Sequence, residues 1–162
     1  MAMNIIIEKY DARYWEEISQ IHDEARKIEL GHASLMDAFR PLEEVVVEEG
    51  LFEYKHVDVA LLDGQVMGFC AYSEDELAWL YVMPEKMRNG IGRQLVAHAL
   101  DTEKSINYIE VLFGNEPAKR LYESFGFEEK EIISGKMPGN ERFRVKVYGM
   151  YRDIPRQYKG LN

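Results

Sequence analysis

A glycine-rich turn carries the clearest chemical signal in the sequence. Residues 86–93 read Lys-Met-Arg-Asn-Gly-Ile-Gly-Arg and lie between a strand-like run and an apolar helical stripe. Glycines let backbone N–H groups approach a ligand closely, and the N-terminus of a following helix attracts anions. Residues 86–100 contain Lys86, Arg88 and Arg93 but no acidic residue. The turn therefore indicates a phosphate or pyrophosphate site, although an ordinary strand-to-helix turn would also use glycine.

Two classes of phosphate-bearing cofactor use such a turn. A dinucleotide fold needs the pattern GxGxxG and an acidic residue about 20 positions later. Glu110 stands near that distance, but Leu95 occupies the third glycine position. An antiparallel hairpin is also predicted before the turn, where the dinucleotide fold has a parallel unit. A nicotinamide cofactor is therefore the less favoured interpretation.

The elements that must position this turn alternate between strands and helices. Runs of β-branched and aromatic residues predict strands, and apolar residues at helical spacing predict helices. Asp63-Gly64 predicts a tight hairpin, because both residues tolerate a positive φ. The predicted strands are 5–10, 57–62, 66–72, 77–82, 109–112, 127–133 and 143–151, and helices are predicted over 11–31, 41–50 and 116–124 and after the glycine turn.

Capping and turn residues set the predicted ends of these elements. Asp11 and Asn115 are suited to helix N-caps, and Pro41 is suited to the first turn of a helix. Gly31 is expected to end the first helix, and the turn-rich residues 134–140 are expected to separate the last two strands. The order predicts a mixed α/β domain with a central strand–helix–strand–helix core.

Composition limits the class of protein. The 162 residues include 20 Lys and Arg against 29 Asp and Glu, a formal net charge of −9. Such a chain should bind neither nucleic acid phosphates nor an anionic membrane surface. No apolar run approaches the roughly 20 residues that cross a bilayer, and no basic leader begins the chain. We expect one cytoplasmic domain over residues 1–162.

Cysteine and histidine give no sign of a metal site. Cys70 is the only cysteine and lies in an apolar strand-like run, so we expect a buried core residue and no disulfide. The four histidines are scattered without a ligand spacing. We therefore expect no metal.

Three groups of residues together resemble the GNAT superfamily of acyl-coenzyme A-dependent N-acetyltransferases. They are Val82-Met83-Pro84, the turn from Arg88 to Gly92, and a later set made of Asn115, Ala118, Tyr122, Gly126 and Phe127. The resemblance covers residues 57–127, and the first fifty residues match only in the order of their elements. Met87 departs from the family pattern, which usually has Arg or Gln there.

The resemblance implies a fold and an activity. The fold would be α/β, with a splayed mixed β-sheet flanked by helices. The activity would be transfer of an acetyl group from acetyl-coenzyme A (acetyl-CoA) to a primary amine of a small molecule or a protein N-terminus. Since no covalent nucleophile is evident in the sequence, the amine would attack directly in a ternary complex.

The resemblance also implies where acetyl-CoA binds. Main-chain groups of the strand that ends at Val82 would hold the pantetheine arm and polarise the acetyl carbonyl. The pyrophosphate would lie on the N–H groups of residues 88–93, and Asn115 would bond to the coenzyme from the opposite side. The implied coenzyme-binding residues are Leu80, Tyr81, Val82, Arg88, Asn89, Gly90, Ile91, Gly92, Arg93, Asn115, Ala118 and Lys119.

Two residues are candidates for catalysis. Given the resemblance, Tyr122 would be the general acid, because a phenol of pKa about 10 can protonate a thiolate whose conjugate acid has a pKa of about 8.5. Glu76 is the candidate base, and strand alternation predicts that it shares a face with Leu80 and Val82. The alternative interpretations are a packed core tyrosine and a solvated acidic turn.

The acceptor is less constrained. Residues 11–50 would form one wall of its pocket, where a cationic amine could meet Glu24, Glu29, His32 and Asp37, although solvent-facing charges are the plainer interpretation. The excess of acidic over basic residues is compatible with several acceptors: a polyamine, an aminoglycoside, an amino acid or a protein N-terminus.

Two further hypotheses concern partners. A non-catalytic sensor of the same fold, which binds acyl-CoA without turnover, is the alternative function. The strand from Arg142 to Tyr151 and the basic residues 152–159 suggest a homodimer edge.

Overall fold

The structure is a computed structural model that describes residues 4–86 and 90–153. Short 3-10 turns connect several of the longer elements, including Ala12–Tyr14, Leu51–Glu53 and Pro84–Lys86. The helices and strands are β1 (Ile5–Lys9), α1 (Trp15–His32), α2 (Leu42–Val45), β2 (His56–Leu62), β3 (Gln65–Tyr72), β4 (Leu77–Val82), α3 (Ile91–Thr102), β5 (Tyr108–Leu112), α4 (Glu116–Glu123), β6 (Glu128–Met137) and β7 (Asn140–Tyr151).

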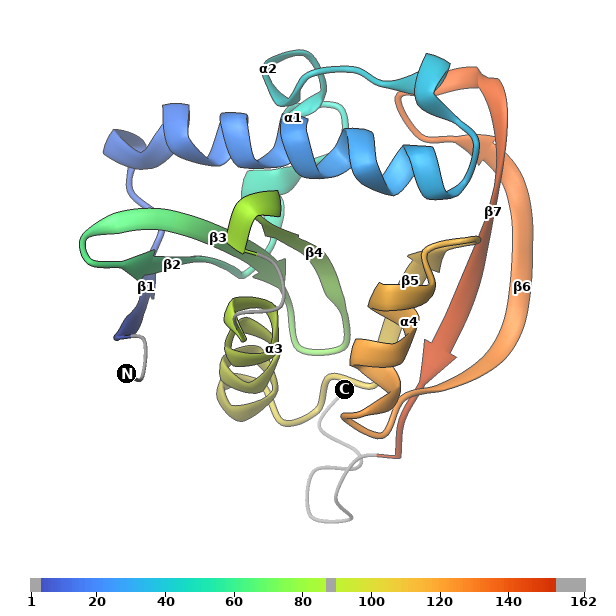
Figure 1. Ribbon diagram of the computed structural model, residues 1–162. Helices are drawn as coiled ribbons and strands as arrows, with labels where there is room; N and C mark the ends of the chain where they lie inside the picture. The colour runs from blue at the N-terminus through green and yellow to red at the C-terminus, as the bar shows by residue number, and fades with distance from the viewer. Residues whose placement is uncertain (1–3, 87–89, 154–162) are drawn as a thin grey trace.

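The strands form two antiparallel sheets that meet at one point. The first has the order β1-β2-β3-β4 and the second the order β5-β7-β6. Among the described residues, a single parallel bridge links Glu76, directly before β4, to Tyr108 of β5, and the two strands diverge beyond it (Figure 1). The mixed α/β architecture with a splayed sheet is therefore confirmed.

Helices cover both faces of the first sheet. α1 and α3 lie on opposite sides of it, and α4 lies beside β5 (Figure 1). Ile18, Ile21 and Phe69 are fully buried between the sheet and α1. On the other face, Leu95 and Ile109 belong to a cluster that includes residues of both sheets. Packing of α3 thus ties the two sheets together.

Local turn chemistry gives the boundaries that the sequence predicts best. Asp63 and Gly64 have φ values of 51° and 81° and close the β2–β3 hairpin, and β4 has the predicted bounds. The last hairpin differs from the prediction of a long turn over residues 134–140. β6 and β7 extend through most of these residues and leave only Pro138-Gly139 as the turn. α1 also continues through Gly31, since a glycine weakens a packed helix without ending it.

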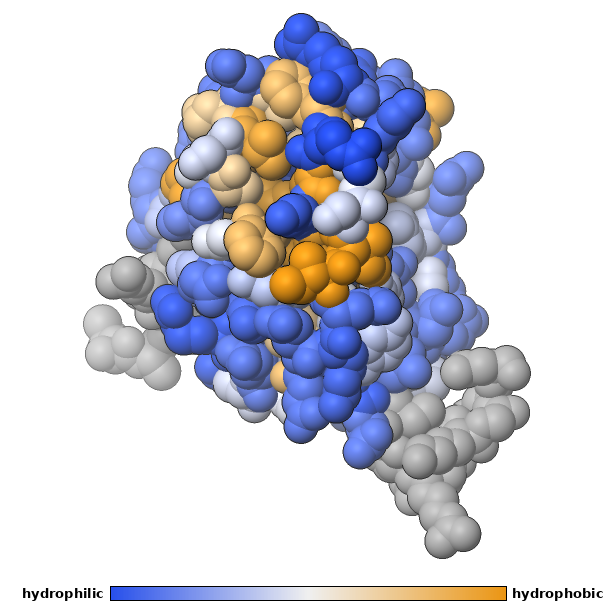
Figure 2. Space-filling view, turned by 90° about the vertical axis from the view of Figure 1, so that its right-hand side faces the viewer, coloured by the Kyte–Doolittle hydropathy of each residue, from blue (hydrophilic) through white to orange (hydrophobic). Residues whose placement is uncertain are grey.

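β7 is an inner strand. It pairs with β5 on one side and with β6 on the other. The prediction that Arg142–Tyr151 is an edge strand is therefore wrong, whereas the homodimer stays a prediction. Residues 154–159 of the proposed basic tail lie outside the described residues. Within this described sheet, β5 and β6 are the outer strands, and Ile132 on β6 is 51% exposed. Figure 2 shows apolar side chains gathered on this side of a mostly hydrophilic surface.

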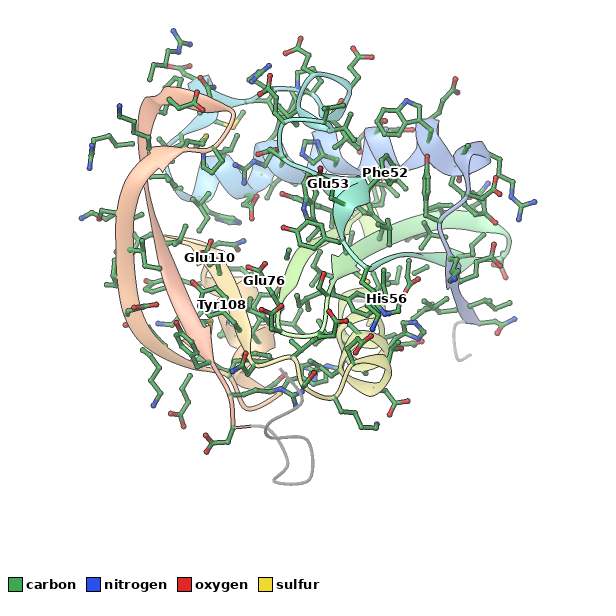
Figure 3. The ribbon with its side chains drawn as sticks, turned by 180° about the vertical axis from the view of Figure 1, so that it is seen from behind. Phe52, Glu53, His56, Glu76, Tyr108 and Glu110 are labelled. Atoms are coloured by element: carbon green, nitrogen blue, oxygen red, sulfur yellow. The ribbon has the colours of Figure 1, made fainter. Side chains whose placement is uncertain are left out.

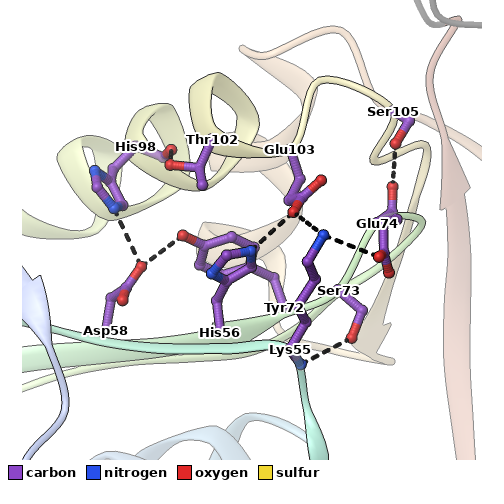
Figure 4. A network of polar contacts seen from close by, with 10 residues as sticks. All are labelled: Lys55, His56, Asp58, Tyr72, Ser73, Glu74, His98, Thr102, Glu103 and Ser105. Carbon is purple, nitrogen blue, oxygen red and sulfur yellow. Dashed lines mark hydrogen bonds and ion pairs between the residues drawn. The ribbon is translucent and has the colours of Figure 1, made fainter.

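A polar network joins β2 and β3 to α3 (Figure 4). The Tyr72 hydroxyl donates to Asp58 Oδ2 at 2.5 Å, and His98 Nε2 lies 3.1 Å from the same oxygen. Nearby, Glu103 accepts from the Lys55 ammonium and contacts His56 Nε2, each at 2.8 Å. Since Asp58 is only 4% exposed, these bonds compensate for the burial of its carboxylate.

The cysteine lies in the core of the first sheet. Cys70 is fully buried in β3, as predicted, and burial raises the pKa of its thiol well above the ordinary range. Within residues 4–86 and 90–153, no helix is both long and apolar enough to cross a membrane.

Candidate functional site

A cavity of about 580 Å³ lies where β4 and β5 diverge. Its volume falls within the roughly 300–1,000 Å³ typical of small-molecule sites. α1, β4, β5, α4 and the start of α3 all contribute to its walls. The lining residues are Ala25, Ile28, Glu29, His32, Leu80, Tyr81, Val82, Gly90, Gly92, Arg93, Glu110, Val111, Asn115, Pro117, Ala118, Leu121 and Tyr122.

One wall of the cavity is the edge of β4 that faces β5. Tyr81 pairs with Phe69 of β3, and the Met83 N–H donates to the Met67 carbonyl at 2.8 Å. Because successive residues of a strand turn their backbone groups to opposite edges, those of Leu80 and Val82 point toward β5. No strand pairs with them there in the described chain, so they can bond to a ligand.

A β-bulge in β4 changes which side chains face the cavity. Ala71 pairs with Trp79 and Tyr72 with Leu77, which leaves Ala78 as the extra residue. Leu77 therefore packs in the same cluster as Leu80 and Val82.

This bulge overturns one prediction. Because Glu76 alternates with Leu77, it lies on the face opposite to Leu80 and Val82. The prediction that Glu76 shares their face is wrong, since simple alternation does not hold across a bulge. Glu76 is not among the residues that line the cavity.

The start of α3 forms a second wall. Gly90 is the N-cap, with a φ of 82°, and the first turn holds no acidic residue. The N–H groups of the first turn have no partner within the helix, and Gly90, Gly92 and Arg93 line the cavity. Ile91 is 1% exposed and packs in the core, so it can offer only its backbone. Met87, Arg88 and Asn89 lie outside the described residues.

α4 forms a third wall. Asn115 is its N-cap, as predicted, and its Oδ1 accepts from the Ala118 N–H at 3.4 Å. Both residues line the cavity, but Lys119 does not. Its ammonium pairs with Glu129 at 2.8 Å and lies 4.3 Å from the ring centre of Tyr148. Lys119 therefore faces away from the predicted coenzyme site.

Tyr122 is a buried phenol in this cavity. It is 7% exposed, and burial, followed by the charge of Glu29, raises its pKa above the ordinary range. Its hydroxyl has no hydrogen bond to any described residue. Because Tyr122 lines the cavity and Ser19 holds the one fully buried hydroxyl without a partner among the described residues, the Tyr122 hydroxyl is reached from the cavity and can bond with a ligand. It stays protonated at neutral pH.

Two carboxylates line the cavity, and a third lies near it. Glu110 accepts a hydrogen bond from the Tyr108 hydroxyl at 2.9 Å. Glu29 pairs with Arg26 and accepts from the Tyr81 hydroxyl at 3.3 Å. Burial, followed by the charges of Glu110 and Asp75, raises the pKa of Glu76. Figure 3 shows Glu76, Tyr108 and Glu110 together between β4 and β5.

The sequence indicates these carboxylates less clearly than the glycine turn. It indicates Glu110 only as the acid of a dinucleotide fold, although the place of this residue in an apolar strand is a signal of its own. Of the four residues proposed to meet an amine, Glu29 and His32 line the cavity, whereas Glu24 and Asp37 do not.

Comparison with known proteins identifies the family. Residues 53–129 match the family model of the acetyltransferase (GNAT) domain. Residues 53–129 carry a GNAT acetyltransferase domain. This confirms the resemblance found in the sequence and places the protein among the acyltransferases. No curated protein matches the chain.

Solved structures extend the likeness beyond the part that matches the GNAT model. The ribosomal-protein-S18-alanine N-acetyltransferase from Escherichia coli aligns with a TM-score of 0.70 at 22% identity, over 98% of this chain and 99% of that one. A GCN5-related N-acetyltransferase from Rhodopseudomonas palustris gives 0.73 at 15% identity, over 95% and 99%. YncA from Salmonella typhimurium, solved with acetyl-CoA, gives 0.67 at 17% identity, over 92% and 94%. These likenesses show that nearly the whole chain has the GNAT fold.

Proposed function

We propose that this GNAT domain transfers an acetyl group from acetyl-CoA to a primary amine by direct attack in a ternary complex. The observation that carries the proposal is the cavity itself. Around one space lie the edge of β4 that pairs with no described strand, the first turn of α3, and the Tyr122 hydroxyl, which has no hydrogen bond to a described residue.

The residues of the cavity fit acetyl-CoA. The first turn of α3 offers N–H groups and the Arg93 guanidinium to a pyrophosphate, with no carboxylate in that turn to oppose it. The backbone groups of Leu80 and Val82 can pair with the amides of a pantetheine arm. The Asn115 amide nitrogen remains available, because the N-cap bond uses only the oxygen.

Bound acetyl-CoA supplies a thioester, whose C–S bond breaks as a C–N bond forms with the amine. An N–H group of the β4 edge is well placed to stabilise the oxyanion that develops on the acetyl carbonyl. Tyr122 gives its hydroxyl proton to the departing thiolate. Its raised pKa keeps that proton in place until transfer.

The amine must lose a proton before or during attack, because an alkylammonium has a pKa of about 10.4. We assign this proton to the Glu110 carboxylate, which lines the cavity, in place of Glu76, which does not. Glu76 lies close enough to interact electrostatically with Glu110. This interaction is a repulsion between two carboxylates, so it gives Glu76 no part in the proton transfer.

Calorimetry of acetyl-CoA binding, followed by thiol release with a panel of amines, tests this function. Binding together with amine-dependent thiol release supports an acetyltransferase. Binding without turnover on any amine would favour the sensor hypothesis. Absence of binding would show that the likeness is one of fold only.

A further inference from the structure

We propose that the acceptor is an elongated polycationic amine that enters the β4–β5 opening from the side of Glu53, Glu76 and Glu110. This inference rests on the proposed function, because it names the acceptor class for the same site. Figure 3 looks onto this side and shows Glu76 and Glu110 between the two strands, with Glu53 above them.

A second cavity, of about 320 Å³, is rich in carboxylates. It is lined by Glu48, Glu49, Gly50, Glu53, Tyr54 and Ser73. Tyr54 connects the two regions: after burial, the charge of Glu76 raises its pKa most, and the charges of Glu110 and Glu49 also contribute. The carboxylates thus form a row that begins at the catalytic cavity and continues past Tyr54.

Most carboxylates of this row form no ion pair, although the charges of Arg26 and Arg40 act on Glu49. Arg26 pairs with Glu29, and Arg40 pairs with Glu48 at 3.0 Å. Among the described residues, the carboxylates of this row that form no ion pair are Glu49, Glu53, Glu76 and Glu110. Burial raises the pKa of both Glu49 and Glu76. A bound cation would offset part of the free energy needed to keep these buried carboxylates charged.

The Tyr122 hydroxyl is the independent sign that a ligand belongs at the inner end of the row. It belongs to a residue that is 7% exposed and lines the same cavity as Glu29 and Glu110, and it has no hydrogen bond to the described residues. A reacting amine beside Tyr122 would have Glu110 near it. Further cationic groups of the same molecule would then reach Glu76, Glu49 and Glu53.

The charges around the opening also separate the two substrates. The start of α3 holds Arg93 and no acidic residue, which suits a polyanionic coenzyme. The Glu53 side holds unpaired carboxylates, which suit a polycation. An amine with a single charge would use only the inner end of the row, so several charges along a chain fit it better.

The test compares n-butylamine, 1,4-diaminobutane, spermidine and a peptide with a neutral side chain at its N-terminus. We expect kcat/KM to rise about tenfold or more from n-butylamine to spermidine, because each added ammonium meets a carboxylate. The advantage of spermidine should shrink as salt rises from about 50 to about 300 mM, since salt screens exposed charges.

A double variant locates the effect on the protein. Glu49→Gln with Glu53→Gln should lower the ratio of kcat/KM for spermidine to that for n-butylamine by about tenfold. The matched control is Glu16→Gln, which removes an exposed carboxylate at the far end of α1 and should leave this ratio unchanged. Circular dichroism and acetyl-CoA binding show whether each variant is folded.

Other results overturn the inference in distinguishable ways. Equal kcat/KM for the monoamine and the triamine, a preference for the neutral peptide, or an unchanged ratio in the folded double variant would overturn it while the acetyltransferase function stands. Failure to acetylate every amine, with acetyl-CoA bound, would overturn the proposed function and the inference with it.

Discussion

At the scale of single residues, Tyr122 gives the sharpest test of the mechanism. Tyr122→Phe removes one hydroxyl that has no hydrogen bond to the described residues and leaves the ring in place. We expect kcat to fall by about 10²-fold or more, because proton donation to the thiolate is lost. Steady-state kinetics measures kcat, and calorimetry should show acetyl-CoA affinity within about twofold of the original protein. An unchanged kcat would exclude Tyr122 as the general acid.

The choice of base is a second question at this scale. Glu110→Gln should lower kcat/KM by about 10- to 100-fold near pH 7 and much less near pH 10, where much of the amine is already unprotonated. Glu76→Gln is the matched control and should have the smaller effect, since Glu76 lies outside the cavity. A larger loss in Glu76→Gln would return the role of base to Glu76.

The raised pKa of Tyr122 predicts the alkaline side of the pH profile. An acid whose folded-state pKa lies above the ordinary value of about 10 keeps its proton throughout the neutral and mildly alkaline range. We therefore expect kcat to rise or stay level, without a decline, up to about pH 10. A decline of kcat between pH 8 and about pH 9.5, measured in the intact enzyme, would contradict this assignment.

At the scale of elements, the link between β3 and α3 depends on the buried Asp58 carboxylate. Tyr72→Phe removes the donor at 2.5 Å from this group and should lower the free energy of unfolding by about 1–3 kcal/mol. Tyr151→Phe is the matched control, because its hydroxyl bonds to Glu131 at an exposed site and should cost about 0.5 kcal/mol or less. Urea unfolding measures both, and equal losses would show that the Asp58 network adds no special stability.

The elements also show what could be predicted from the sequence. The β2–β3 hairpin and the Asn115 cap depend on residues close together in the chain, so local chemistry indicates them. The face of Glu76 depends on a bulge between β3 and β4, and the inner place of β7 depends on pairing with β5. Such pairings join distant segments, and no local pattern encodes them.

Some candidate site residues are likewise indicated by local motifs, and others depend on contacts between distant segments. The glycines at the start of α3 and the position of Tyr122 follow from local motifs. The presence of Glu29 in the cavity requires α1 to cross β4, which only the packing of the first sheet determines. Lys119 fits the motif in sequence, but its ion pair with Glu129 turns it away from the cavity.

At the scale of the whole molecule, the cavity lies between two sheets that a single strand bridge joins. Leu80 and Val82 belong to one sheet, and Glu110 and Val111 belong to the other. A ligand in the cavity would contact both sheets at once. Its binding energy should therefore stabilise the folded chain and restrict the separation of β4 from β5.

Thermal unfolding with acetyl-CoA tests this. At about 100 times Kd, a ligand that binds only the folded state adds about 2.7 kcal/mol, and a chain of this size gains roughly 2–4 °C in Tm per kcal/mol. We expect a rise of about 5–10 °C, and Tyr122→Phe should keep it, because the hydroxyl serves catalysis. Hydrogen exchange should slow in both β4 and β5. Protection confined to α3 and α4 would mean that the coenzyme does not reach the opening between the sheets.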